Sequence, residues 1–196
     1  MKWYHPIACD NTVKKPLVCD YSNLEENGYD QFNFKKGISI RKWNDNLFMQ
    51  AKQKRNNGIP DDALQNYMML PIYSPIFIDE LSKANIEGIQ YLPINILKLN
   101  NDCLNGFYIA NILNFIEAFD EKKSVFNRFS QDFPNPNVRG QIAGVMKFVL
   151  KREKLIGFDI IRLKEYELCF FVSEKFKDIF EQNKFTGYSF KEVELV

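Results

Sequence analysis

The sequence predicts an α+β fold, in which a mixed or mainly antiparallel sheet carries a few short helices. Short apolar runs rich in β-branched and aromatic residues recur between turn-forming residues, which is typical of strands. Amphipathic helical spacing is clear at one place near the end of the sequence. With 18 Phe, 9 Tyr and 45% hydrophobic residues among 196, phenylalanine is the expected core filler. A chain of this length suits a single domain, residues 1–196.

The segment Leu168–Val196 predicts a strand, a helix and a second strand. Cys169–Val172 is apolar and too short for a helix, and Ser173 is a suitable N-cap for the helix that follows. The buried face of that helix is formed by residues at positions i, i+3 and i+4, namely Phe176, Ile179 and Phe180. Thr186 and Gly187 end it, and alternating residues from Tyr188 onward form the second strand.

From the start of the chain, Trp3–Cys9 is the first expected strand, and Leu17–Cys19 is a second short apolar run after a break at Lys14–Pro16. Asp20–Asn33 is polar and rich in turn residues, so it is expected to be a loop or an irregular edge. Phe34–Ile40 resembles a strand and a turn.

Two weaker helical patterns follow. Leu47–Arg55 carries a basic cluster of Lys52, Lys54 and Arg55, which is better interpreted as a solvated face than as a phosphate site. Pro60 begins a second short helix that reaches Tyr67, in which Asp61 and Asp62 serve as N-terminal caps rather than metal ligands. Leu70–Ile78 contains Pro71 and Pro75 and is therefore expected to be an edge strand.

A repeat of the last segment begins at Phe77. Phe77-Ile78-Asp79-Glu80 matches Phe171-Val172-Ser173-Glu174 in residue type, and Gly88 matches Gly187. Nine residues separate Asp79 from Gly88, whereas fourteen separate Ser173 from Gly187, so the first helix is expected to be shorter. This pattern predicts an internal duplication into the halves 1–100 and 101–196, each ending in a strand-helix-strand unit.

The second half opens at Phe107-Tyr108, which parallels Trp3-Tyr4. Residues 107–118 fit both a strand and a helix, and a strand is favoured. Ser130–Gly140 contains Pro134 and Pro136 and is the clearest internal loop. Gln141–Val149 is mostly apolar, and a charged turn at Lys151–Lys154 leads to two extended pieces between Phe158 and Cys169.

Motifs for catalysis or cofactor binding are missing from the sequence. His5 is its one histidine and is interpreted as structural, and no glycine-rich phosphate loop or nucleophile motif is present. The sequence has four cysteines, Cys9, Cys19, Cys103 and Cys169. Their spacing fits neither a zinc site nor a disulfide framework. These observations favour a binding protein over an enzyme, with no catalytic, metal or cofactor-binding residues.

Charge and hydropathy give further expectations about partners and location. The net charge of +1 gives no long-range field that would attract nucleic acid or an anionic membrane. Neither a signal-peptide h-region nor a run of about 20 apolar residues is present. We therefore expect a cytoplasmic protein with no nucleic-acid or membrane partner.

Several stretches together resemble the eleventh-numbered family of immunity proteins from bacterial polymorphic toxin systems. The resemblance rests on Lys2-Trp3-Tyr4, Gly37 before Trp43, Glu87–Pro93, Phe107-Tyr108, Phe119-Asp120 ahead of Lys123-Ser124, Gly157–Leu163, Phe171–Glu174 and Thr186–Phe190. It covers nearly the whole chain, and it is weakest at 44–70 and 125–145.

The resemblance implies a cytoplasmic protein that binds a cognate toxin domain encoded nearby and blocks it in the producing cell. It assigns neither toxin-binding residues nor an oligomeric state. An enzyme or small-ligand-binding protein with an unmarked acidic site is the alternative hypothesis. A deep pocket lined by several carboxylates of raised pKa would favour that alternative.

Overall fold

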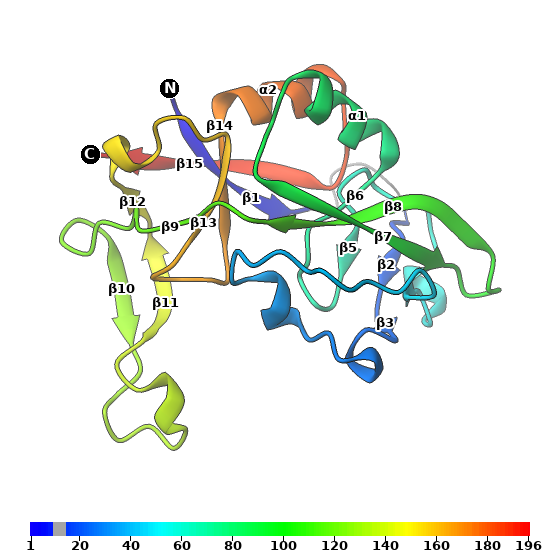
Figure 1. Ribbon diagram of the computed structural model, residues 1–196, viewed down its shortest axis with the longest axis horizontal. Helices are drawn as coiled ribbons and strands as arrows, with labels where there is room; N and C mark the ends of the chain where they lie inside the picture. Colours follow the sequence, from blue (N-terminus) through cyan, green and yellow to red (C-terminus); the bar gives the residue numbers. More distant parts are fainter. Residues whose placement is uncertain (10–14) are drawn as a thin grey trace.

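The computed structural model describes residues 1–9 and 15–196, so Lys14 of the predicted break lies outside the described residues. Within them the fold is α+β, as predicted, with two α-helices and mostly short strands (Figure 1). The helices are α1 (Pro75–Lys83) and α2 (Glu174–Gln182). The strands are β1 (Trp3–Ala8), β2 (Val18–Cys19), β3 (Tyr21–Ser22), β4 (Phe48–Gln50), β5 (Gln65–Asn66), β6 (Ile72–Tyr73), β7 (Ile89–Leu97), β8 (Cys103–Ile112), β9 (Phe115–Ile116), β10 (Val125–Arg128), β11 (Ile142–Lys147), β12 (Val149–Leu150), β13 (Ile160–Leu163), β14 (Phe170–Ser173) and β15 (Tyr188–Leu195).

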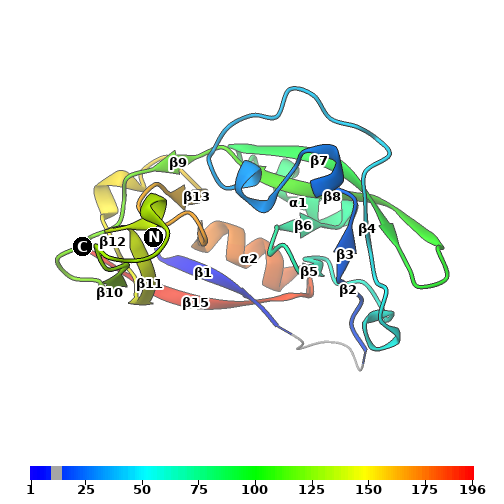
Figure 2. The same ribbon diagram turned by 90° about the horizontal axis from the view of Figure 1, so that it is seen from below.

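Two mixed sheets organise the described residues. One has six strands in the order β12-β15-β1-β14-β13-β9, and the other has five in the order β3-β4-β7-β8-β6. β10 and β11 form a separate hairpin that projects away from the remaining strands in Figure 1 and lies at the end of the molecule with both termini in Figure 2. Buried side chains form three clusters, of which one fills the space between the two helices and the sheets, and another lies on the opposite face of β1 and β14.

The predicted unit at the end of the chain is confirmed. β14 ends at Ser173, whose extended backbone makes it the N-cap of α2, and the Phe176 backbone N–H donates to Ser173 Oγ over 3.3 Å. Phe176 and Phe180 are buried on the inner face of the helix. Gly187 then adopts a φ of +106°, and β15 begins at the next residue.

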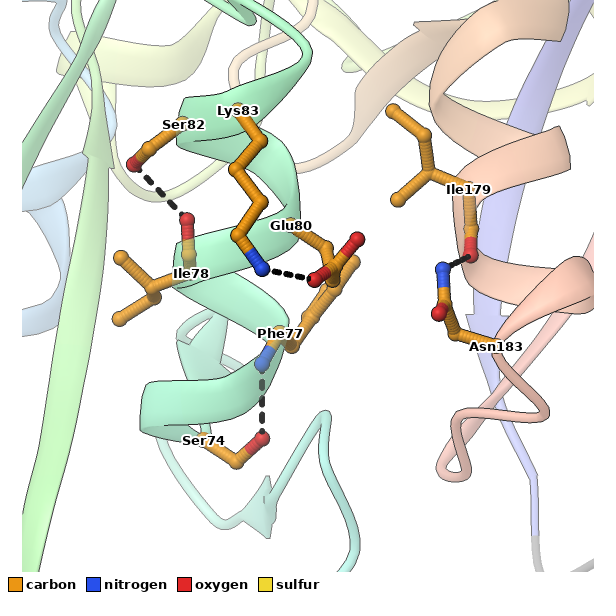
Figure 3. A network of polar contacts seen from close by, with 8 residues as sticks. All are labelled: Ser74, Phe77, Ile78, Glu80, Ser82, Lys83, Ile179 and Asn183. Atoms are coloured by element: carbon orange, nitrogen blue, oxygen red, sulfur yellow. Dashed lines mark hydrogen bonds and ion pairs between the residues drawn. The ribbon is translucent and has the colours of Figure 1, made fainter.

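The first unit differs from the prediction. Phe77, Ile78 and Asp79 lie inside α1, and the N-cap is Ser74, whose Oγ accepts from the Phe77 backbone N–H over 3.3 Å (Figure 3). Pro75 was interpreted as an edge-strand residue, but it occupies the first helical position, where a missing N–H costs nothing. The predicted edge strand is therefore limited to β6 at the edge of the five-stranded sheet.

With Ser74 as the cap, the two units match more closely than the sequence indicated. Fourteen residues separate Ser74 from Gly88 and Ser173 from Gly187, and α1 and α2 each have nine residues. In each unit an antiparallel strand lies between the two strands of the unit: β8 lies between β6 and β7, and β1 lies between β14 and β15.

The registers of the central strands also correspond. Tyr108 of β8 pairs with Tyr73, the residue before Ser74, and Tyr4 of β1 pairs with Val172, the residue before Ser173. Each central strand thus comes from the half of the chain that does not contain its unit. Duplication of the halves 1–100 and 101–196 stays a prediction, since β10 and β11 in the second half lie outside the matching units.

The two units are joined through aspartate side chains and through aromatic packing. Ser74 Oγ donates to Asp62 over 2.8 Å, and the same carboxylate accepts from the Thr186 backbone N–H of the other unit over 3.0 Å. α1 and α2 lie side by side above the sheets (Figure 1). The Phe77 ring lies 5.6 Å from that of Phe176 and 5.1 Å from that of Phe180, measured between ring centroids.

Three other predicted elements are wrong and two are confirmed. Residues 34–40 contain the end of a 3-10 helix rather than a strand, 47–55 contains β4 rather than a helix, and 60–67 contains β5 within turns. The apolar patterns of these three segments are weak, so tertiary contacts decide their conformation. Residues 107–118 are strand, in β8 and β9, and 130–140 is the loop that connects β10 to β11.

Replacement of the cap serines tests the matched units. Ser74→Ala and Ser173→Ala are each expected to lower the free energy of unfolding by about 1 to 2 kcal/mol, because the helix loses an N-cap and an aspartate loses a donor. Ser82→Ala is the control, since Ser82 is an exposed residue of α1 whose Oγ donates only to the Ile78 carbonyl (Figure 3). Urea denaturation measures the effect, and an equal loss in Ser82→Ala would contradict the capping role.

Glycine replacement tests how closely the units approach each other. A Cβ at Gly187 would lie 2.2 Å from the Ala63 carbonyl oxygen, whereas a Cβ at Gly28 would meet nothing within 4 Å, although both residues have positive φ. We expect Gly28→Ala to cost about 1 kcal/mol, and Gly187→Ala to cost about 3 kcal/mol or more. Thermal unfolding of both variants measures the difference, and similar melting temperatures would argue against a tight contact at Ala63.

Candidate functional site

Three adjoining hollows surround the turn between β13 and β14, around Leu168. They have volumes of about 370, 430 and 1180 Å³. His5, Ile7 and Cys169 line both of the smaller hollows, and Leu168 lines the first and the largest. The three hollows therefore lie next to one another, and together they are named here the concave region around Leu168.

The first hollow is named here the Met69 cleft, and it is lined by β1, by the turn after β5 and by the start of β14. Four of its lining residues are large hydrophobic side chains that remain exposed in the described structure: Ile7, Tyr67, Met69 and Leu168. Because side chains alternate along a strand, Ile7 and His5 point to the face opposite Tyr4, which packs beneath α2. Pro6, Phe170 and Tyr188 line the cleft from the other face, and none of its lining residues belongs to α1 or α2.

The polar groups of the Met69 cleft already have partners within the protein. The Asp20 carboxylate accepts from the backbone N–H groups of Lys52 and Gln53 and from Asn56 Nδ2, at 2.7 to 3.2 Å. Burial raises the pKa of Cys19 to about 12 and that of Cys169 to about 11, so both thiols are protonated at neutral pH. The lining of the cleft is mainly apolar, and its one carboxylate among the described residues, Asp20, is already hydrogen-bonded within the protein.

His5 lies where the two smaller hollows meet. Its ring lies 5.4 Å from that of Phe171 and 5.9 Å from that of Phe148, and its Nδ1 is 3.1 Å from the Phe170 carbonyl oxygen. Burial lowers the pKa of His5, and the contact with Phe170 opposes this effect only in part. The imidazole is therefore neutral at pH 7. These contacts fit the structural interpretation of His5, which stays a prediction.

The largest hollow, named here the hairpin groove, lies between the β10–β11 hairpin and the β13–β14 turn. Acidic and basic residues both line it, and Arg128 bridges Glu121 and the Gly140 carbonyl oxygen at 2.6 and 2.7 Å. Burial raises the pKa of Glu165, whose Oε1 accepts from the Phe119 backbone N–H over 3.3 Å. One such carboxylate does not make the acidic site of the alternative hypothesis, which requires several.

The polar residues singled out in the sequence make contacts within the protein or are exposed to solvent. Asp62 joins the two units, and the Lys52 ammonium lies over the Tyr21 ring, 3.1 Å from its centroid. Lys54 and Arg55 are exposed in a short 3-10 helix, as a solvated face would be. Cys9, Cys19, Cys103 and Cys169 are free, and no group of three potential metal ligands occurs among residues 1–9 and 15–196.

Sequence reasoning did not find the Met69 cleft. Its exposed hydrophobic residues come from β1, from the turn after β5 and from the β13–β14 turn, so no local spacing relates them. The sequence predicts Tyr67 at the end of a helix, but Tyr67 lies in the turn after β5. Met69 has a φ of +53°, which is uncommon for a residue with a side chain, and no sequence pattern indicates it.

Acidification tests the environment of His5. The folded state favours the neutral imidazole, so as pH falls below about 6.5 the unfolded chain binds the proton more readily and the free energy of unfolding decreases. Because His5 is the one histidine of the sequence, NMR titration of its ring should give a pKa below 6.5. Comparison with His5→Gln isolates its share of the pH dependence, and a ring pKa at or above 6.5 would contradict the burial.

The family comparison covers the whole of this architecture. The model of the Imm11 immunity protein family matches residues 5–195, which include both strand-helix-strand units and all three hollows. No curated protein matches the sequence. Within the described residues, neither helix has the length and hydropathy needed to cross a membrane. With a family model that matches nearly its full length, the chain belongs to the Imm11 family of immunity proteins.

Proposed function

We propose that the protein binds a cognate secreted or contact-delivered toxin domain in the cytoplasm of the producing cell and neutralises it by stoichiometric inhibition. The family match over residues 5–195 carries the proposal, because an immunity family implies a toxin as partner. We further propose that the 196 residues act as one domain without a cofactor, and that the toxin is encoded in a neighbouring reading frame.

The concave region around Leu168 supports a binding role. Specific protein interfaces use a few aromatic or aliphatic anchors that become fully desolvated, surrounded by polar groups. The Met69 cleft supplies exposed hydrophobic side chains, and the adjoining hairpin groove supplies charged groups of both signs. The acidic-site enzyme is less well supported, because Asp20 and Glu165 lie in different hollows and both accept backbone hydrogen bonds.

Co-expression with the toxin domain of the adjacent reading frame tests the proposal. Cells that produce the toxin domain alone are expected to stop growing, and growth should return when the present protein is produced with it. The two chains should also co-purify as a complex of fixed composition. Continued killing together with no co-purification would contradict the proposed function.

A titration separates binding from catalysis. In a purified assay of the toxin, stoichiometric inhibition predicts that activity falls linearly and reaches its minimum at about one equivalent of inhibitor when the complex is tight. An enzyme that modified the toxin or its product would protect at far less than one equivalent and increasingly with time. That second result would contradict stoichiometric inhibition.

A further inference from the structure

We propose that the Met69 cleft is the docking surface for the toxin, and that it receives an uncharged apolar segment of the toxin domain. This inference rests on the proposed function and goes beyond it by naming the surface and the chemistry of its partner. Neither the family match nor the fold assigns a contact residue.

Exposed hydrophobic groups are concentrated at this cleft. Met69 is 68% exposed, and Tyr67, Leu168 and Ile7 are 46%, 45% and 41% exposed. All four line the same hollow of about 370 Å³. Single exposed hydrophobic residues are normal on protein surfaces, but a group around one concave apolar site marks a place where a partner covers it.

One wall of the cleft is held in place by the side chain of Asn66. Its Oδ1 accepts from the Leu70 backbone N–H over 3.0 Å, and its Nδ2 donates to the Leu64 and Leu70 carbonyl oxygens at 3.2 and 2.7 Å. The Tyr67 hydroxyl lies 2.8 Å from Ser22 Oγ. The turn therefore presents Tyr67 and Met69 outward in a fixed conformation.

The opposite wall is held by a buried arginine. Arg162 is 2% exposed, and its Nη1 donates to the carbonyl oxygens of Glu167 and Cys169 at 2.7 and 3.4 Å. These two residues flank Leu168 and thereby fix it at the mouth of the cleft. A surface whose walls are already ordered loses little conformational entropy on binding, which favours tight association.

The backbone of Met69 is strained, which makes the folded state less stable. Its φ of +53° is one that side chains with a Cβ rarely adopt, whereas glycine, asparagine and aspartate tolerate it. A methionine held there in spite of the strain is expected where its flexible apolar side chain serves binding. A purely structural position would be better filled by glycine.

The charges around the cleft define the partner segment. Asp20 accepts three hydrogen bonds from its own chain, and no lysine or arginine of the described residues lines the cleft. The other two hollows are lined by charged groups of both signs, including Lys147 and Arg128. An anionic side chain would be desolvated there without a cationic partner among the described lining residues, and a cationic one would compete with the three donors that Asp20 already has. The complementary toxin surface therefore carries uncharged apolar side chains at the cleft.

Two substitutions at Met69 test the assignment without harming the fold. Met69→Gly removes the side chain and Met69→Asp places a charge at the cleft, and both residue types tolerate positive φ. We expect each to raise the Kd for the toxin domain that the wild-type protein neutralises by at least about tenfold, with an unchanged or higher Tm. Titration calorimetry and thermal unfolding measure these quantities.

Ile156→Asp is the matched control, because Ile156 is 77% exposed but does not line any of the three hollows. It should leave both the Kd and the Tm unchanged. If the wild-type protein binds the toxin and the Met69 variants bind equally well, the docking surface is wrong and the proposed function stands. If the wild-type protein binds no toxin, the proposed function itself fails.

Sedimentation and native mass spectrometry distinguish other occupants of the cleft. A monomeric, ligand-free wild-type protein supports the assignment to the toxin. A wild-type dimer that Met69→Asp dissociates would show that a second copy covers the cleft, and a co-purified apolar molecule that Met69→Asp loses would show a small-ligand site. Either of these two results would overturn the proposal.

Discussion

The structure depends on two strands that are inserted into sheets formed by distant parts of the chain. β1 lies between β14 and β15, and β8 lies between β6 and β7. Without β1, the strands on either side of α2 would have no backbone partner in common, and without β8 the same would hold for those beside α1. Because buried backbone groups must form hydrogen bonds, neither unit can be completed by its own residues. The two halves of the chain are therefore mutually dependent.

Two regions of the protein have different physical requirements. One is the contact between the two strand-helix-strand units, and the other is the concave region around Leu168. At the contact between the units, Asp62 accepts hydrogen bonds from both units, and the phenylalanine rings of α1 and α2 pack against each other. The phenylalanine rings are buried, and both oxygens of the half-buried Asp62 carboxylate accept hydrogen bonds. At the Met69 cleft, side chains that could stabilise the fold by burial remain exposed, and one of them has strained backbone. The packed helices therefore contribute to stability, while the surface proposed to bind the toxin lies where hydrophobic side chains remain exposed.

How much the sequence predicts depends on where the determining interactions lie. The unit around Ser173 was predicted correctly because its cap, its apolar face and Gly187 all act within fifteen residues. In the matching unit the sequence predicts the N-cap five residues too late, at Asp79 instead of Ser74, because Pro75 fits both an edge strand and the first turn of a helix. Residues 47–67 could not be predicted from local pattern. β4 pairs with β7 and β5 pairs with β2, so partners far away in the sequence determine their conformation.

The candidate binding surface could not be predicted from the sequence, for the same reason. Ile7, Met69 and Leu168 meet only after the central strand β1 is inserted beside β14. The family resemblance indicated the class of function because matching residues for caps and turns occur along most of the chain. Cap and turn residues specify the fold. They do not identify the binding surface, which must suit one particular toxin.

The insertion of β1 also has a consequence for protein synthesis. Tyr4 leaves the ribosome before its pairing partners Val172 and Glu192, which follow it by 168 and 188 residues in the sequence. The six-stranded sheet must then form after release of these late segments, and such long sequence separations slow folding. Neither side of the six-stranded sheet around β1 can be completed until β14 and β15 have been synthesised, so the surface proposed to bind the toxin forms late.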